Sequence, residues 1–296
     1  MTATPITEVA PPAAPDERPE TSSGRGLPIS TKLALGFLVL LLAAAIFAPW
    51  VAPYDPIEQD MSARQVGSSW SHLLGTDRFG RDIFSRLLWG GRNAFAGVAI
   101  AIAVAVGIGI PWGTIAGFWP RVAGTVMMRI TDIFLAFPTL VLAVAITGSL
   151  GIGLVTSMVS VGLVLSPNTA QLTRSGVLAV RNSEFVQSAR LSGVRTSSII
   201  LRHVLPLALG PVVIQVTIYT GLAFVIQGAL AFLGLGPQRP TPSWGSDLSD
   251  AYSQILVSPW QILPPGLLLG LVVLSVYQCG DTLRDHMSDR AFEGRR

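Results

Sequence analysis

Residues 181–206 read RNSEFVQSARLSGVRTSSIILRHVLP, a polar and arginine-bearing island between two long apolar segments. The small residues Ser188 and Ala189 come first, Gly193 follows, and a Leu-Pro pair ending at Pro206 closes the island. Glycine and proline are the residues that most often end or begin helices. This order therefore predicts a short helix, a turn at the glycine, and the start of a second helix.

The composition of the chain is that of a polytopic membrane protein. Half of its 296 residues are hydrophobic and only 12% are charged, whereas about 25% charged is usual for soluble domains. The single cysteine, Cys279, excludes an intramolecular disulfide, and no thiolate metal site is expected. An ordered polar loop between membrane spans predicts a docking surface for a soluble partner.

Apolar runs predict an all-α fold with six membrane-spanning helices. The expected spans are residues 33–51, 94–116, 124–147, 153–172, 207–233 and 262–280. The first run is about 19 residues long, whereas the apolar region of a signal peptide is about 7–15 residues, so an uncleaved span is expected.

The two ends of the chain are expected to lie outside the bundle. Residues 1–31 are rich in Pro, Thr, Ala and Glu and lack apolar periodicity, which predicts a disordered tail. The expected division is a tail at 1–31, a first span with an outer segment at 32–93, a transmembrane core at 94–285, and a second tail at 286–296.

Basic residues predict the orientation of the spans. With six spans both termini lie on one side, and that side carries 14 of the 20 Arg and Lys residues. Five of the other six lie between residues 64 and 92, and five acidic residues of the segment 52–93 balance them. Because loops rich in Arg and Lys stay in the cytoplasm, both termini and the polar island are predicted to be cytoplasmic, in an inner-membrane protein.

The segment 83–89 carries apolar residues at helical spacing. Two interpretations stay open for it, a helix lying at the membrane interface and a loop helix packed on its neighbours. His72 has no partner at metal-ligand spacing and is not expected to bind a metal.

The third span contains charged residues, which are costly in a membrane and often functional. Arg129 and Asp132 are three residues apart, so they can pair on one helix face. They are expected to be either a structural ion pair or part of a moving gate. Pro138 removes a backbone donor and predicts a kink in this helix.

Several classes of protein are disfavoured by what the sequence lacks. No acid or histidine relay stands out at mid-membrane, which argues against a proton- or sodium-coupled secondary transporter. No Ser/His set or carboxylate pair points to an intramembrane hydrolase. Lys32, the only lysine, has no glycine-rich turn before it, so this chain is not expected to bind ATP through a phosphate-binding loop. No nucleic-acid motif is present.

The Gly- and Pro-rich segment 232–245 is expected to be a rigid loop on the outer side. Its aromatic residues suit a membrane interface. A docking rim for a soluble binding protein is the alternative.

Five ordered stretches carry a family resemblance that covers residues 33–290. In the polar island, Gln187-Ser188-Ala189 is followed by Gly193 and closed by Arg202-His203-Val204-Leu205-Pro206. The other four stretches are His72-Leu73-Leu74-Gly75-Thr76-Asp77 with Gly80-Arg81-Asp82 and Ser85-Arg86; Met128-Arg129 through Pro138; Phe232-Leu233-Gly234-Leu235-Gly236 with Trp244-Gly245; and Gly280-Asp281 with Leu283-Arg284-Asp285.

With these stretches the chain resembles the C-type permease subunit of dipeptide/oligopeptide ABC importers, which has the type I permease fold. The island resembles the cytoplasmic EAA loop of such permeases, here residues 173–206. Two positions depart from the family pattern: Gln187 stands where Glu is usual, and Tyr277 stands where Asn is usual.

The resemblance implies a subunit that is not itself an enzyme. It implies half of a pore shared with a second permease subunit, two cytoplasmic ATPase subunits that bind ATP and Mg, an extracytoplasmic binding protein, and a di- or oligopeptide cargo. Nickel, glutathione or another small solute is the alternative cargo, and a secondary transporter or a membrane scaffold is the alternative class. The residues expected to couple to the ATPase are Glu184, Phe185, Gln187, Ser188, Ala189, Arg190, Leu191, Gly193 and Arg195.

Overall fold

The computed structural model describes the backbone of residues 27–293 and the side chains of residues 27–287. Within this part of the chain the regular structure is helical, apart from one isolated β-bridge between Thr76 and Asp82. The predicted all-α fold is confirmed. Residues 1–26 and 294–296 of the predicted tails lie outside the described residues. The second predicted tail, from residue 286, begins within a helix that continues to Glu293.

Twelve α-helices are described, with short helical turns at Met61–Ala63, Ile200–Val204 and Pro259–Ile262. The helices are α1 Ile29–Ile46, α2 Ala48–Val51, α3 Ile83–Phe118, α4 Val122–Leu135, α5 Thr139–Leu150, α6 Leu154–Val180, α7 Glu184–Leu191, α8 Thr196–Ile199, α9 Leu205–Ala208, α10 Gly210–Phe232, α11 Trp244–Tyr252 and α12 Leu263–Glu293.

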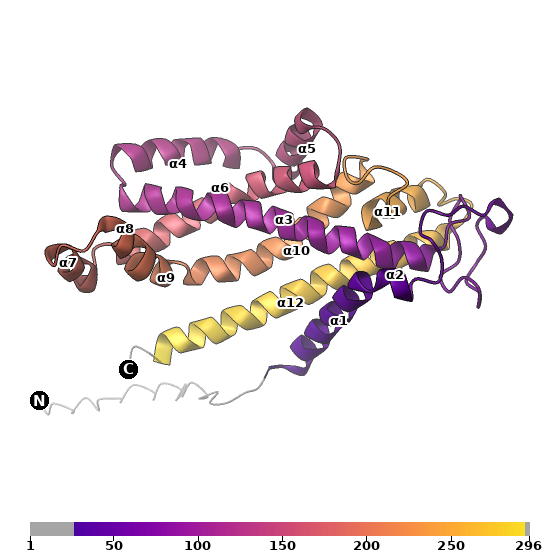
Figure 1. Cartoon of the computed structure of the whole chain (residues 1–296), viewed down its shortest axis with the longest axis horizontal. Coiled ribbons are helices and arrows are strands. Elements are labelled where there is room, and N and C mark those ends of the chain that lie inside the picture. Colours follow the sequence, from indigo (N-terminus) through magenta and orange to yellow (C-terminus); the bar gives the residue numbers. More distant parts are fainter. Residues whose placement is uncertain (1–26, 294–296) are drawn as a thin grey trace, which may run out of the picture.

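The centre of the bundle is the pair α3 and α6, which pack along much of their length (Figure 1). Small residues make this close approach possible. A Cβ atom on Gly113 would lie 2.3 Å from the Ala170 carbonyl oxygen, and one on Gly109 would lie 2.5 Å from the Thr169 side chain. Helices in lipid are held by such close packing because no hydrophobic effect drives them together. Figure 1 shows α4 and α5 on one side of this pair and α12 with α1 on the other.

The number of apolar spans differs from the prediction for a physical reason. Four segments are long and apolar enough to cross a membrane, and the bent pair α4–α5 is a fifth candidate. α6 has 27 residues but is not among them. It packs against α3, α4, α5 and α10, so much of its surface meets protein rather than lipid and tolerates polar residues. α6 supplies the sixth span.

Two helices extend beyond their predicted limits. α3 begins at Ile83, so the segment 83–89 is the start of a long helix rather than a separate interfacial one. Ile83, Leu87 and Leu88 are buried against the bundle. The expected boundary between residues 93 and 94 therefore falls inside α3. α6 continues to Val180, so the island loop begins about two turns later than residue 173.

The third predicted span is broken rather than kinked. α4 ends at Leu135, α5 begins at Thr139, and the two helices are bent by 95° relative to each other. Pro138 immediately precedes α5. Proline disfavours helical backbone in the residue before it and cannot donate to the preceding turn, so the helix stops there and restarts in a new direction.

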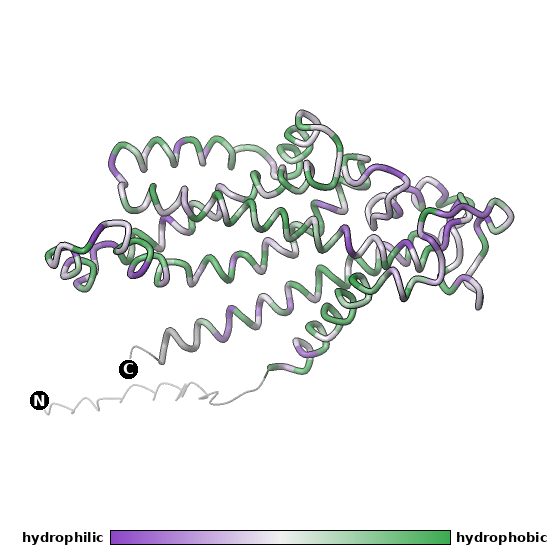
Figure 2. The backbone as a smooth tube through the Cα atoms, viewed as in Figure 1, coloured by the Kyte–Doolittle hydropathy of each residue, from purple (hydrophilic) through white to green (hydrophobic). Residues whose placement is uncertain are grey.

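Hydrophilic residues gather at the two ends of the bundle (Figure 2). One end carries α7 and α8, and is called the α7 end below. The other carries the segment 52–82 and α11, and is called the α11 end. Between them the helices are mostly apolar, as Figure 2 shows.

Candidate functional site

α7 is a short amphipathic helix at one end of the bundle, built from the sequence EFVQSARL. Its ends suit the helix dipole, because Glu184 lies in the first turn and Arg190 in the last. Ser183 occupies the N-cap position, and its hydroxyl donates to the Val180 carbonyl at 2.7 Å instead of capping α7. α7 is thereby joined directly to the end of α6.

Gly193 ends this helix in the left-handed conformation, with φ at +75°. Its N–H donates to the Arg190 carbonyl at 3.1 Å, and the Val194 N–H donates to the Ala189 carbonyl at 3.1 Å. This pair of bonds is the Schellman motif, which glycine favours because it has no Cβ. The predicted helix and glycine turn are confirmed as local structure.

Val186 anchors α7 to the bundle. It is fully buried in a cluster with Phe118, Val177 and Ile199, which come from α3, α6 and α8. Two other apolar residues of α7, both among those expected to couple to the ATPase, lie on the surface. Phe185 is 44% exposed and Leu191 is 90% exposed. Leu191 therefore presents almost its whole side chain to whatever lies outside the bundle.

Two exposed polar residues of α7, Gln187 and Arg190, contact their own chain. Gln187 donates from Nε2 to the Asn182 carbonyl at 2.9 Å, which ties the side chain to its own loop. The Arg190 guanidinium lies over the Phe118 ring, 5.1 Å from its centroid, a cation–π contact. Ala189 packs against the same cluster as Val186. Glu184, Ser188 and Arg195 are exposed.

A wide cleft lies between α7–α8 and the turn that joins α3 to α4. It has a volume of about 880 Å³, and Trp119, Arg121, Arg181 and Arg190 are among the residues that line it. Within the described part of the chain, none of these arginines forms an ion pair with an acidic residue. The α7 end is therefore basic, open and partly apolar.

The two charged residues of the third span are both exposed on α4. Among the described ion pairs, none joins Arg129 to Asp132. Asp132 instead accepts a hydrogen bond from Gln171 of α6 at 3.4 Å. The predicted structural pair is not formed in this conformation, and a gate role for these residues stays a prediction.

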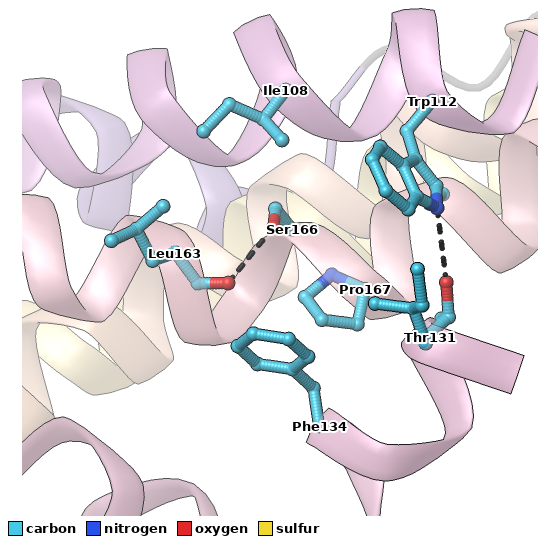
Figure 3. Close-up of a pocket in the computed structure, with 9 residues that line it drawn as sticks. Ile108, Trp112, Thr131, Phe134, Leu163, Ser166 and Pro167 are labelled. Atoms are coloured by element: carbon cyan, nitrogen blue, oxygen red, sulfur yellow. Dashed lines mark hydrogen bonds between the residues drawn. The ribbon is translucent and has the colours of Figure 1, made fainter. Parts of the chain in front are cut away.

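An apolar cavity of about 150 Å³ lies between α3, α4 and α6 (Figure 3). Figure 3 shows Trp112 of α3 facing Thr131 of α4, and the indole Nε1 donates to the Thr131 hydroxyl at 3.2 Å. Phe134 and Pro167 close the cavity from α4 and α6. This hydrogen bond attaches α4 to the bundle just before the helix breaks.

The α11 end is held by buried ion pairs. Arg81 and Arg86 are each almost fully buried. Arg81 donates to Asp77 at 2.6 Å and to Asp250 at 3.3 Å. Arg86 donates to Asp247 at 3.0 Å from Nε and to the Pro56 carbonyl at 2.8 Å. These bonds attach the segment 52–82 and the start of α3 to α11.

Further pairs extend this network. Asp250 also accepts from Arg78 at 2.9 Å and pairs with Arg239 at 2.7 Å, so three arginines share one carboxylate. Burial raises the pKa of Asp247, and the neighbouring Arg86 opposes that shift. His72, which appeared isolated in the sequence, pairs with Asp82 at 3.0 Å. Within the described residues no cluster of His, Cys, Asp and Glu could hold a metal ion.

The Gly- and Pro-rich loop 232–245 is attached to the bundle by hydrogen bonds. The Trp244 indole is buried and donates to the Leu87 carbonyl at 2.8 Å, and Asn93 donates to the Pro242 carbonyl at 2.9 Å. Trp244 therefore packs inside the protein rather than at the membrane interface. The rigid-loop interpretation fits these contacts, whereas a docking rim stays a prediction.

Sequence reasoning missed two kinds of residue. Asp247 and Asp250 were not connected with the arginines of the 78–86 segment, and no local pattern could connect residues about 160 positions apart. Val186 was overlooked, although its spacing from Ala189 places both on one helix face.

Two family models match the sequence. Residues 109–293 match the model for the binding-protein-dependent transport system inner membrane component. Residues 32–69 match the model for the N-terminal TM domain of oligopeptide transport permease C. The first match contains α4 to α12 and hence the whole α7 end.

Several known proteins are similar over most of their length. The di/tripeptide transport system permease protein DppC of Pseudomonas aeruginosa is 40% identical over 268 residues, which covers 88% of each chain. The dipeptide permease DppC of Alkalihalophilus pseudofirmus is 39% identical, covering 88% of this chain and 86% of its own. The glutathione transport system permease protein GsiD of Shigella flexneri is 38% identical, covering 86% and 84%.

One solved structure has a similar fold. It is an inward-facing form of the MetNI methionine ABC transporter, with a TM-score of 0.55 and 18% identity. The match covers 68% of this chain and 96% of the other. At this identity the likeness concerns the fold alone.

Proposed function

This chain belongs to the family of binding-protein-dependent transport system inner membrane components, within its dipeptide/oligopeptide C-type permeases, and we propose that it forms half of a peptide-import pore. It is a multi-pass inner-membrane protein and a transport component. The proposal concerns its cargo, its orientation and the parts with which it assembles.

α7 is the observation that carries the proposed coupling role. It projects from the bundle with Phe185 and Leu191 on its surface, yet Val186 holds it to α3, α6 and α8. A helix with a buried anchor and exposed apolar side chains can transmit a push from a partner to the spans it touches. We assign the exposed face of α7, with Glu184 and Ser188, together with Arg195 at the start of α8, to an ATPase subunit on a separate chain.

The α7 end is proposed to be cytoplasmic, with both termini on the same side. The arginine count of the loops supports this orientation. The partners in the proposal are a second permease subunit, two ATPase subunits that bind ATP and Mg, and a binding protein at the α11 end. This chain itself would bind neither ATP nor Mg.

The proposed cargo is a dipeptide or a short oligopeptide. Relatives named for dipeptide and di/tripeptide transport support this choice. Glutathione is the second candidate, because a relative named for glutathione transport has nearly the same identity. Glutathione is itself a modified tripeptide, so the two candidates share peptide chemistry.

The test is uptake by the reconstituted importer, with this chain, its second permease, its ATPases and its binding protein in proteoliposomes. We expect ATP-dependent uptake of a labelled dipeptide that persists after the proton gradient is collapsed. An excess of unlabelled dipeptide should compete better than glutathione or nickel. Uptake that survives ATPase inactivation but stops without the gradient would instead identify a secondary transporter. Unchanged uptake without this chain would identify a scaffold.

A further inference from the structure

Five polar side chains line one side of the bundle and are called the amide strip here. They are Asn168, Gln171 and Ser175 of α6 and Gln215 and Tyr219 of α10, and together with Leu172 they line an open hollow of about 270 Å³. The α6 members are three and four residues apart, so they share one helix face. The Asp132 carboxylate adjoins the strip, because it accepts from the Gln171 amide.

The amide strip lies at membrane depth. At 1.5 Å per residue, Asn168 is about 18 Å along α6 from its end at Val180, and Tyr219 is about 14 Å along α10 from its start at Gly210. A bilayer core is about 30 Å thick. The strip therefore occupies the middle and the α7 half of the spans rather than a headgroup region.

A lipid-facing position does not suit these side chains. In the part of the chain that the structure describes, the Asn168 side chain makes no hydrogen bond. An amide in hydrocarbon without a partner is costly. The apolar cavity of Figure 3 lies on another face of α6, lined by Leu163 and Pro167. α6 thus has one apolar face and one polar face, and the polar face requires water or polar groups beside it.

We propose that the amide strip lines the hydrated translocation path and hydrogen-bonds the main chain of the passing peptide. The inference rests on the peptide cargo proposed above. Asn and Gln each offer a donor and an acceptor, which matches the N–H and C=O of a peptide bond. The five side chains carry no charge, so they discriminate little among the side chains of the cargo. Weak, repeated contacts of this kind let a ligand enter and leave.

Cysteine labelling tests whether the strip is lined by water. Cys279 is the single cysteine of the chain, so Cys279→Ala provides the parent for Asn168→Cys, Gln171→Cys and Gln215→Cys. The matched control is Val213→Cys. Val213 is 47% exposed on α10, and it lies two residues from Gln215, on nearly the opposite face.

The assembled importer in membrane vesicles is treated with a charged, membrane-impermeant methanethiosulfonate reagent. Because the reactive thiolate forms only where water reaches it, the strip cysteines should react about tenfold or more faster than Val213→Cys. When a saturating concentration of dipeptide is added together with the binding protein and ATP, the labelling of the strip cysteines should become slower. Equal rates at all four positions would overturn the proposal. Slow labelling of the strip cysteines, together with a disulfide between a strip cysteine and the second permease, would also overturn the proposal. The strip would then be an interface between the two permease subunits.

Uptake tests the main-chain contact itself. Gln171→Leu removes hydrogen-bonding capacity and should lower maximal uptake by about fivefold for each hydrogen bond lost. The loss should be the same for neutral, cationic and anionic dipeptides at saturating binding protein. Losses that differ strongly with peptide charge would overturn main-chain recognition. A parent importer that moves no peptide would refute the cargo, whereas the labelling rates would still report the hydration of the strip.

Discussion

Both ends of the molecule carry arginine residues, but these arginines have opposite environments at the two ends. At the α11 end, Arg81 and Arg86 are buried and each meets a carboxylate of its own chain. At the α7 end, Arg181 and Arg190 line an open cleft and meet no carboxylate within the described residues. The buried arginines of the α11 end are thus paired within the chain. The α7 end leaves positive charge and apolar surface that another molecule can contact.

This difference indicates that the α11 end contributes to the stability of the fold and the α7 end to its assembly with a partner. Buried charges must keep their partners, because an isolated charge in the interior is strongly destabilising. Exposed groups contribute little to folding but can contribute much to binding. Substitutions at the α11 end should therefore change stability, and those on the exposed face of α7 should change docking.

The largest effect is expected from Arg86→Ala, which leaves the buried Asp247 without its partner. We expect a loss of about 3–5 kcal/mol of stability, the usual cost of breaking a buried pair. Thermal unfolding in detergent and the amount of protein in the membrane would measure it. Arg92→Ala is the matched control, since Arg92 lies on the same helix, is exposed and, among the described residues, forms a cation–π contact with Trp89 but no ion pair or hydrogen bond. Its cost should stay below about 1 kcal/mol.

A double variant, Arg86→Met with Asp247→Leu, sharpens this test. Replacing both members of a buried pair by apolar residues is often neutral. The double variant should recover most of the stability that Arg86→Ala loses. If it is as unstable as the single variant, the ion pair is not the cause of the loss, and the lost hydrogen bonds from Arg86 to the Pro56 and Pro240 carbonyls would have to explain it.

The second effect is expected at the other end. Leu191→Ala should weaken binding of the ATPase subunit by about 2 kcal/mol, or about 30-fold in Kd, if Leu191 is a central anchor of the interface. Its thermal stability should stay unchanged, because the side chain is 90% exposed. Leu256→Ala makes the same truncation at the α11 end, where Leu256 is 97% exposed. Similar losses of ATPase affinity for both variants would contradict the assignment of α7.

The α7 end could be predicted in detail because its signals are local. Small residues, a glycine and a Leu-Pro pair within 26 positions specify a helix, a left-handed cap and a second helix. The spans follow from composition in the same way. The exception is α6, whose polar residues shortened the expected span to 153–172, although the helix runs to Val180. Packing on neighbouring helices, which a hydropathy pattern does not contain, explains the extra turns.

The α11 end could not be predicted because its partners are distant in sequence. The acidic residues near 55–82 were the obvious balance for the arginines between 64 and 92, and Asp77 does pair with Arg81, whereas Asp82 pairs with His72. Asp247 and Asp250 come from α11, on the far side of four spans. The balance of charges within one segment does not show which residues of another segment will pair with it. That pairing depends on how the helices pack in the folded bundle.

A smaller effect is expected from Val186→Ala, which tests the anchor between α7 and the bundle. Removing two buried methyl groups should cost about 1.5 kcal/mol locally. Hydrogen exchange of the α7 amides should become faster, and uptake should fall because a loosened helix transmits less motion. Ser188→Ala on the exposed face is the control and should leave exchange unchanged. Unaltered exchange in Val186→Ala would show that the buried contact does not hold α7.

The smallest effect is expected from Gly193→Ala, and it is conformational alone. The φ of Gly193 is +75°, and a Cβ there would meet no atom within 4 Å. The cost is therefore that of left-handed backbone for an L residue, about 1 kcal/mol. Gly193→Asn should recover part of it, because Asn tolerates this conformation.

Gly36→Ala is the control, since Gly36 lies within α1 with open space around it. Alanine favours a helix there by about 0.5–1 kcal/mol. Opposite signs for the two Gly→Ala changes in α-helical circular dichroism melts would show that the turn after α7 depends on backbone conformation. Equal signs would show that it does not, and the direction in which α7 points would then depend on its contacts with the bundle, such as those of Val186.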